Sequence, residues 1–76
     1  MAKSIYSKKY GQFLELLIEA RQNANLTQIE VASRLGRPQS FVSKYENGER
    51  RLDVVEFLNI AKVIDFDPVK LVRKLI

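Results

Sequence analysis

The 76-residue sequence predicts an all-α domain, a compact bundle of five helices. Apolar residues recur at helical spacing in the segment 8–24 and again after residue 53. Two helices should begin with a capping box, in which the first side chain and a Glu three residues later each accept a hydrogen bond from the other residue's backbone N–H. These boxes are Thr27–Glu30 and Asp53–Glu56. Gly36 and Gly48 stand where the helices between the two boxes should end.

The first helix is expected from Lys8 to about Ala24, with Ser7 as its N-cap. Its apolar stripe, which Ile18 and Ala20 widen, consists of Tyr10, Phe13, Leu14, Leu17 and Ala24. Residues 1–6 are expected to form a short flexible leader. The length of the chain, 1–76, is that of one small domain with one modest core.

Arg21 places a charge on the apolar face of this first helix, where residues 10, 14, 17 and 21 align. Glu46 is a candidate partner, because it follows Tyr45 near the packed side of the third helix. A charge that close to a core is tolerated when it is paired. Alternatively, the side chain of Arg21 extends past the stripe into water. Spacing alone leaves both interpretations open.

The second helix should begin at Thr27, and its buried arc should consist of Ile29, Ala32 and Leu35, with Val31 at the edge. Glu30 and Arg34 are spaced for a favourable i,i+4 pair. Gly36 supplies a left-handed helix end, and Pro38 disfavours a helical conformation in the residue before it. The chain should therefore turn a tight corner there.

The third helix is expected from about Pro38 to Asn47, with Val42, Tyr45 and Pro38 facing inward. The opposite side consists of Ser40, Ser43, Lys44 and Asn47, with Gln39 at its N-terminal tip. This side has no carboxylate, whereas an ordinary solvated side more often includes acids. Its amide, hydroxyl and ammonium groups can hydrogen-bond base edges or phosphates. Residues 27–47 are therefore interpreted as a helix-turn-helix whose second helix reads DNA.

The net charge is +4, and most of it lies around this third helix. Between residues 34 and 51 five basic residues face two acidic ones, which gives +3: Arg34, Arg37, Lys44, Arg50 and Arg51 against Glu46 and Glu49. Such a concentration is expected of a protein that binds a polyanion. A run of charges such as 49–51 is usually only solvated surface, but this one follows the polar helix directly, where a phosphate backbone would pass.

Cysteine and histidine are absent, which excludes disulfides, thiolate and imidazole metal sites, and histidine-based catalysis. No glycine-rich loop is present to cradle a phosphate and no nucleophile with its base can be assembled, so an enzyme is not expected. No metal, cofactor or small-molecule effector is expected either. No segment is long and apolar enough for a membrane span or a signal peptide, which indicates a soluble cytoplasmic protein.

The fourth helix should run from Asp53, its cap, to about residue 64, with a buried face of Val54, Phe57, Leu58, Ala61 and Ile64. After a turn at Asp65-Phe66, Asp67 should cap a last helix, Pro68–Ile76, with the proline in its first position. This helix has two apolar edges, Val69-Val72-Ile76 and Leu71-Leu75. One edge can close the core, and the other is left over, either as a partner surface or on a frayed terminal helix.

A long motif extends over residues 25–50, with NLTQ at 25–28, Ala32, Leu35-Gly36, and QSFVSKYENGER at 39–50. This motif resembles the helix-turn-helix of the Cro/repressor-type (XRE) family, and the resemblance extends from Tyr6 to about Leu71. It implies a compact five-helix bundle, that is, a lambda repressor-like DNA-binding domain. It also implies a transcriptional regulator of bacteria, phages or mobile elements, with repression as the expected role and activation as the alternative. Such a regulator binds double-stranded DNA at a pseudo-palindromic operator as a homodimer.

By the same resemblance, the base-reading residues would be Gln39, Ser40 and Lys44. The DNA backbone contacts would be Gln28, Ser43, Asn47, Arg50 and Arg51, with Gln28 as a phosphate clamp at a helix N-terminus. Arg21 and Glu46 occupy the positions of the family's usual salt bridge, which favours the paired interpretation.

Two positions depart from the common pattern of the family. Pro38 stands where many members have a Ser or Thr cap, and Phe41 stands where a small or polar residue is more common. The Phe41 ring could touch a thymine methyl, wedge between bases or pack against the neighbouring helix, and packing ranks first. Arg37 likewise could contact DNA or pack.

Two other functions are compatible with the same predicted five-helix bundle. A helical protein-interaction module, such as an antitoxin or an adaptor, predicts no concentration of basic residues on the third helix. A restriction-modification controller would be a special case of DNA binding, which gene neighbours distinguish and residues do not.

Overall fold

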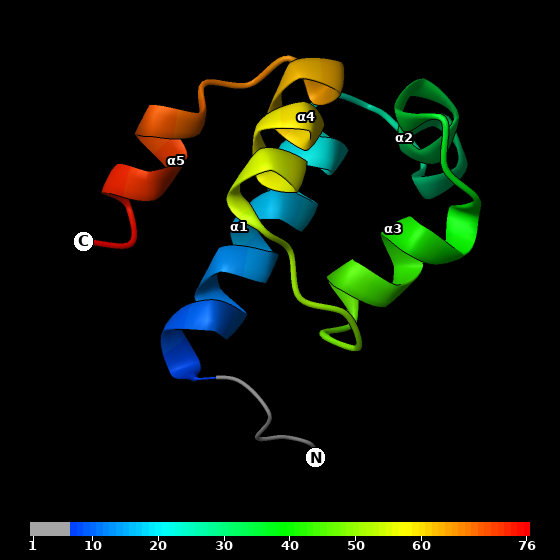
Figure 1. Ribbon diagram of the computed structural model, residues 1–76. Helices are drawn as coiled ribbons and strands as arrows, with labels where there is room; N and C mark the ends of the chain where they lie inside the picture. Colours follow the sequence, from blue (N-terminus) through cyan, green and yellow to red (C-terminus); the bar gives the residue numbers. More distant parts are fainter. Residues whose placement is uncertain (1–6) are drawn as a thin grey trace.

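The computed structural model describes residues 7–76, and in that range it contains five helices and no strand (Figure 1). The helices are α1 (Lys8–Asn23), α2 (Gln28–Leu35), α3 (Gln39–Glu46), α4 (Val54–Ile64) and α5 (Pro68–Arg73). The all-α prediction is confirmed. The expected leader, residues 1–6, lies outside the described residues. None of the described helices has the length and apolarity that crossing a membrane requires.

The helices pack around α1 and α4, which lie in the middle of the view in Figure 1, with α2 and α3 on one side and α5 on the other. Phe13 of α1 meets Phe57 of α4 edge to face, with ring centroids 5.3 Å apart. The core is completed by buried side chains from every helix: Leu14, Leu17, Val31, Ala32, Phe41, Val42, Tyr45, Ile60, Ile64 and Leu71. This core holds α3 against α1 and α2 along one side only.

Local sequence signals explain where the helices begin. Ser7 accepts a hydrogen bond from the N–H of Tyr10, and both predicted capping boxes, Thr27–Glu30 and Asp53–Glu56, are formed in both directions. Asp67 accepts from the N–H of Val69, and a proline fills the first position of α5 as predicted. These side chains satisfy N–H groups that have no partner within the helix.

The helix ends depend on positive φ angles. Gly36 has φ +70° and Gly48 has φ +79°, as predicted, while α4 ends at Asp65, a non-glycine residue with φ +71°.

Two predicted helix bounds were wrong. Pro38 is the extended N-cap of α3 and is exposed, because its ψ of 155° places it before the first helical turn. The last helix ends at Arg73, three residues early, since Ile76 is exposed and has no core to pack against.

Several predictions of buried residues were also wrong. Ile29 is 62% exposed while Val31 is fully buried, and the predicted face of α4 is rotated, with Val54 71% and Leu58 47% exposed and Ile60 buried. Ala24, expected at the end of the α1 stripe, is exposed. In α2 and α4 apolar residues lie on two sides, so the spacing alone does not determine which side meets the core. The packing of the neighbouring helices selects the buried side.

The predicted pair between Glu30 and Arg34 is not formed as a salt bridge. Arg34 instead donates from Nη1 to the backbone carbonyl of Val63, 2.8 Å away on α4. This bond ties α2 to the C-terminal end of α4, where a cation also interacts favourably with the helix dipole.

Candidate nucleic-acid interface

One side of α3 is exposed and carries no acidic residue. Val42 and Tyr45 are fully buried on the opposite side, as predicted. The exposed side, called the reading face below, consists of Gln39, Ser40, Lys44 and Asn47, with Ser43 half-buried at its edge. Ser43 donates within the helix, to the carbonyl of Ser40 at 3.4 Å. The buried side of α3 therefore fixes the helix in place, while the side chains of the reading face remain exposed to solvent.

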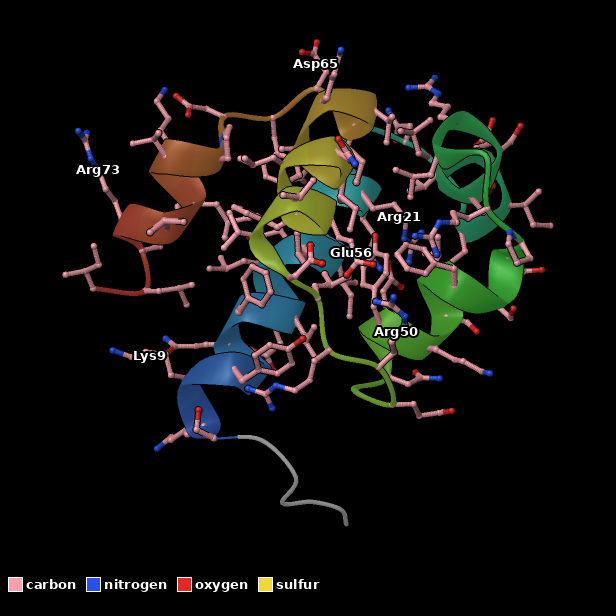
Figure 2. The ribbon with its side chains drawn as sticks, viewed as in Figure 1. Lys9, Arg21, Arg50, Glu56, Asp65 and Arg73 are labelled. Carbon is pink, nitrogen blue, oxygen red and sulfur yellow. The ribbon has the colours of Figure 1, made fainter. Side chains whose placement is uncertain are left out.

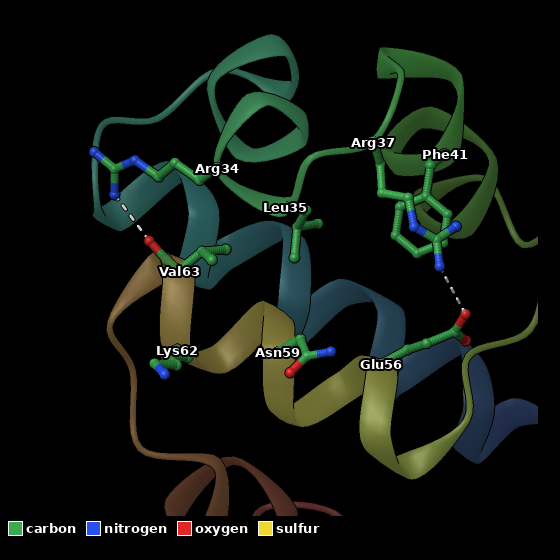
Figure 3. Close-up of a pocket in the computed structure, with 8 residues that line it drawn as sticks. All are labelled: Arg34, Leu35, Arg37, Phe41, Glu56, Asn59, Lys62 and Val63. Carbon is green, nitrogen blue, oxygen red and sulfur yellow. Dashed lines mark hydrogen bonds and ion pairs between the residues drawn. The ribbon is translucent and has the colours of Figure 1, made fainter.

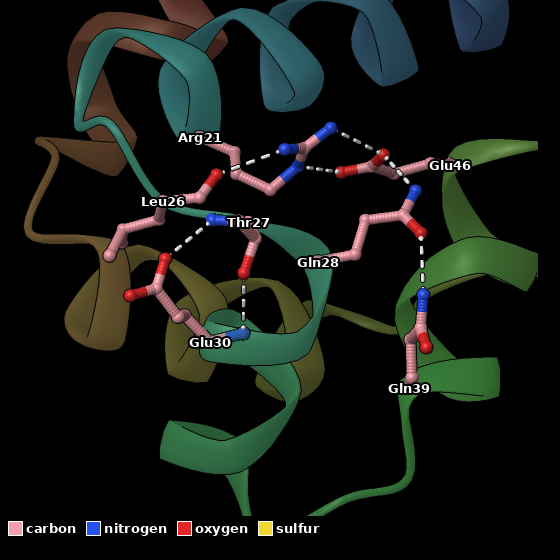
Figure 4. Close-up of polar contacts among 7 residues, drawn as sticks. All are labelled: Arg21, Leu26, Thr27, Gln28, Glu30, Gln39 and Glu46. Atoms are coloured by element: carbon pink, nitrogen blue, oxygen red, sulfur yellow. Dashed lines mark hydrogen bonds and ion pairs between the residues drawn. The ribbon is translucent and has the colours of Figure 1, made fainter.

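A salt bridge joins α1 to α3 beneath this face. Arg21 donates from Nε to Oε2 of Glu46 at 2.8 Å and from Nη2 to Oε1 at 3.1 Å, and it also donates to the carbonyl of Leu26 at 2.9 Å (Figure 4). Both side chains are almost entirely removed from solvent, with 14% of Arg21 and 4% of Glu46 exposed. The paired interpretation is confirmed. The hydrogen bonds to Glu46 raise the pKa of Arg21 above its ordinary value.

The hydrogen bonds continue from this salt bridge to the reading face. Gln28, in the first turn of α2, donates from Nε2 to Oε1 of Glu46 at 2.8 Å. Its own carbonyl oxygen accepts from Nε2 of Gln39 at 3.5 Å, as Figure 4 shows. Because Glu46 can only accept, it turns the amide of Gln28 so that the oxygen points toward Gln39. The orientation of Gln39 is therefore linked to the ion pair.

Arg50 is fixed by Glu56, which the sequence predicts only as part of a helix cap. Nη1 and Nη2 of Arg50 lie 2.9 and 2.7 Å from the two carboxylate oxygens of Glu56, and the two side chains point toward one another in Figure 2. The same carboxylate accepts from the N–H of Asp53. These donors lower the pKa of Glu56 to about 2. The capping box was the signal that could have identified Glu56, because it bends that carboxylate back toward the α3–α4 loop.

Phe41 packs inside the protein, as the first-ranked interpretation predicted. Its ring is buried and meets Tyr45 at a centroid distance of 5.5 Å. The guanidinium carbons of Arg37 and Arg50 lie 4.3 and 4.9 Å from its centroid, within the range of cation–π contacts. An aromatic residue at this position therefore gives the two arginines beside α3 a common support.

Arg51 is directed toward the start of α1. Its guanidinium carbon lies 4.2 Å from the ring centroid of Tyr10, whose hydroxyl accepts a hydrogen bond from the N–H of Leu52 at 3.1 Å. Tyr10 therefore anchors the loop that follows α3. Within residues 7–76 no group of three or more acidic side chains is placed to hold a metal ion.

Comparisons with known proteins identify the fold and the family. A family model described as helix-turn-helix matches residues 17–71. A search of curated protein sequences gave no match. Among solved structures, the chain resembles an XRE-family-like protein from Pseudomonas syringae pv. tomato str. DC3000, with a TM-score of 0.85 and 58% identity over 88% of this chain and 82% of that one.

Two restriction-modification controller proteins are similar as well. C.AhdI from Aeromonas hydrophila has a TM-score of 0.76 and 29% identity, over 86% of this chain and 98% of that one. A point mutant of C.Esp1396I has a TM-score of 0.82 at 20% identity, over 93% of this chain and 90% of that one, which shows the shared fold. The family model covers more than half of the chain. The XRE-family-like protein from Pseudomonas syringae is 58% identical over most of the length of both chains. The chain therefore belongs to the XRE family of helix-turn-helix proteins, which are DNA-binding transcription regulators.

Proposed function

We propose that this protein represses transcription by binding a pseudo-palindromic operator as a dimer, with α3 of each copy in the major groove. The observation that carries the proposal is the reading face, an exposed strip of amide, hydroxyl and ammonium groups without a carboxylate. A major groove about 12 Å wide admits one helix, and its base edges present the donors and acceptors that such groups recognise. Occupancy of the operator then excludes polymerase.

Base reading is assigned to Gln39, Ser40 and Lys44. The hydrogen bond from Gln39 to Gln28 uses one of the two amide hydrogens of Gln39, which leaves one N–H and the carbonyl oxygen. One donor and one acceptor on the same amide match N7 and N6 of adenine, and the ammonium of Lys44 matches O6 and N7 of guanine. Each good pair of this kind contributes roughly 1–3 kcal/mol of discrimination.

Contacts to the DNA backbone are assigned to Gln28, Ser43, Asn47, Arg50 and Arg51. Arg50 uses three of the five N–H donors of a guanidinium in bonds to Glu56 and to the Arg51 carbonyl, which leaves two for a phosphate. Glu56 therefore orients the guanidinium of Arg50. If Arg50 and Arg51 each neutralise one phosphate, a dimer gives a log–log salt slope of about −4.

The surface proposed for dimerisation is an apolar hollow between α4 and α5. It is lined by Val54, Phe57, Leu58, Pro68, Val69 and Val72, without polar side chains. Four of these residues are large and exposed, and such a patch on a small domain marks an interaction site. Val69 and Val72, from one of the two predicted apolar edges of the last helix, form part of it. On a pseudo-palindromic operator the two α3 helices of the dimer would occupy major grooves about 34 Å apart.

The experiment that tests this function is selection of bound sites from a random pool of duplexes. The expected result is a symmetric motif whose two halves are separated by about one helical turn, because a two-fold dimer presents two identical α3 helices. An asymmetric motif would contradict the dimer, and a pool without enrichment at low salt would contradict sequence-specific binding. A transcription assay on the selected site then measures whether occupancy lowers the transcript level.

A second candidate is favoured by the 29% identity to a protein described as a restriction-modification controller. In this alternative the selected sites lie upstream of an endonuclease gene and its methyltransferase gene. The positions of the selected sites in the source genome distinguish the two candidates. A controller should have its sites beside such a gene pair, whereas a general repressor should have them upstream of other genes.

A further inference from the structure

Phe41 is a buried aromatic residue whose ring contacts two guanidinium groups. The guanidinium carbons of Arg37 and Arg50 lie 4.3 and 4.9 Å from its centroid. Figure 3 shows the guanidinium of Arg37 in front of the ring, with one nitrogen turned toward Glu56. Only 7% of Phe41 is exposed, and the ring of Tyr45 meets it edge to face at a centroid distance of 5.5 Å. The Phe41 ring is therefore a fixed support for two cations.

Of these two cations, Arg50 is the one held in a single orientation. Its Nη1 and Nη2 donate to both carboxylate oxygens of Glu56, at 2.9 and 2.7 Å, and Nη1 also donates to the carbonyl of Arg51 at 2.9 Å. Arg37 approaches Glu56 only to 3.6 Å, which is too long for a hydrogen bond, and 45% of its side chain is exposed. The protein therefore specifies the position of Arg50 more closely than that of Arg37.

The hydrogen bonds of Arg50 leave one edge of its guanidinium open. Nη1 uses both of its N–H groups and Nη2 uses one, so the N–H of Nε and the second N–H of Nη2 have no acceptor among the described residues. These two N–H groups lie along one side of a planar group and point in parallel, which matches two oxygens of a phosphate. The side chain is 38% exposed, so DNA can reach this edge.

We propose that Phe41 is a positioning residue for the DNA backbone contact of Arg50, an inference that rests on the proposed function. Two parallel hydrogen bonds to Glu56 orient the guanidinium within its own plane, but they still permit it to tilt about the line through the two acceptor oxygens. The Phe41 ring, over which the guanidinium lies, blocks that tilt. The open edge is therefore aimed before DNA arrives, and Arg50 loses little side-chain freedom on binding.

The first test measures the motion of Arg50 in the protein without DNA, from the nitrogen NMR relaxation of its Nε–H group. Phe41→Leu keeps an apolar side chain without the ring and should clearly lower the order parameter of this group. Glu56→Gln should lower it as well, although Gln can still form the capping box. Phe13→Leu is the matched control at a ring that contacts Phe57, and it should leave the order parameter unchanged. An unchanged value in Phe41→Leu would overturn the proposal.

The second test is a double-mutant cycle on DNA affinity. Phe41→Leu should weaken binding of the dimer to every duplex about tenfold, because two Arg50 side chains must then be ordered on binding. The same change should have little effect when Arg50→Gln is already present, and its full effect when Arg37→Gln is present. Equal weakening in the Arg50→Gln background would mean that Phe41 acts only by placing α3, and it would overturn the proposal.

The affinity of Glu56→Gln separates orientation from charge. Removal of this acid raises the net charge by one, and by charge alone it should strengthen DNA binding. If Glu56 and Phe41 together orient Arg50, Glu56→Gln should weaken DNA binding instead, and tighter binding would overturn the proposal. A wild type that binds no duplex would contradict the proposed function itself. A wild type that binds, with the effect of Phe41→Leu intact in the Arg50→Gln background, would contradict only this inference.

Discussion

Arg21 of α1 and Glu46 of α3 form a bidentate ion pair, with N–O distances of 2.8 and 3.1 Å, almost entirely out of solvent. The pair lies between the core and the reading face, and Gln28 connects it to Gln39. It therefore serves two purposes, since it fixes the position of α3 on α1 and orients an amide that we assign to base reading.

Breaking this pair from one side should be costly. Arg21→Met leaves Glu46 buried with one neutral donor, Gln28, and should lower the free energy of unfolding by about 3 kcal/mol. The double variant Arg21→Met with Glu46→Met removes both charges and should cost clearly less than the sum of the two single changes. Urea unfolding of the four proteins measures the coupling. Additive costs would mean that the two charges do not stabilise each other.

The hydroxyl of Tyr45 should contribute nothing to stability. It is buried and has no hydrogen-bond partner among the described residues, and burial raises the pKa of the phenol. Tyr45→Phe should therefore leave the free energy of unfolding unchanged or raise it by up to about 1 kcal/mol. Tyr10→Phe is the matched control, since that hydroxyl accepts from Leu52, and it should cost about 1 kcal/mol. A clear loss in Tyr45→Phe would show that its hydroxyl is bonded.

The end of α4 should be improved by glycine. Asp65 has φ +71°, a conformation in which an L side chain is strained, and its negative charge meets the negative end of the helix dipole. Asp65→Gly should raise the free energy of unfolding by about 1 kcal/mol. Asp65→Asn removes only the charge and should give a smaller gain. A destabilised glycine variant would contradict strain at this position.

How far local sequence determines this fold can be seen by comparing its helix ends with its buried faces. Caps and left-handed glycines act within four residues of themselves, so Ser7, Thr27 and Gly36 were correctly predicted. The sides of α2 and α4 that meet the core were not, because Ile29 and Val31 are both apolar and only the packing of other helices selects between them. The spacing of apolar residues predicts that a helix is amphipathic. When the helix has two apolar edges, however, the spacing does not determine which edge faces the core.

The candidate site divides in the same way. The exposed face of α3 and the Arg21–Glu46 pair were predicted from the spacing and from the resemblance to a known family. The link from Glu56 to Arg50 was missed, since it depends on how the α3–α4 loop folds back on the cap of α4.

Stability should fall with acid in a way that depends on Glu56. Its pKa is about 2, below the ordinary value of 4.5, because Arg50 and the N–H of Asp53 stabilise the carboxylate. A carboxyl with a lowered pKa in the folded state stabilises the protein above pH 4.5, and this contribution is lost as the pH falls from about 4.5 to 2. Unfolding free energies at pH 6 and pH 2.5 should differ less in Glu56→Gln than in the wild type. The exposed control Glu49→Gln should keep the wild-type difference, and an unchanged difference in Glu56→Gln would contradict the pairing.

Operator recognition by α3 is tested most directly by the affinities of wild type, Lys44→Ala and Arg51→Ala for the selected duplex and for every single-base-pair variant of it. Lys44→Ala should lose about 1–3 kcal/mol of discrimination at one position of each half-site and retain it elsewhere. Arg51→Ala should weaken binding to all of the duplexes by about the same factor. Wild-type discrimination at every position in Lys44→Ala would contradict the assignment of α3 as the reading helix.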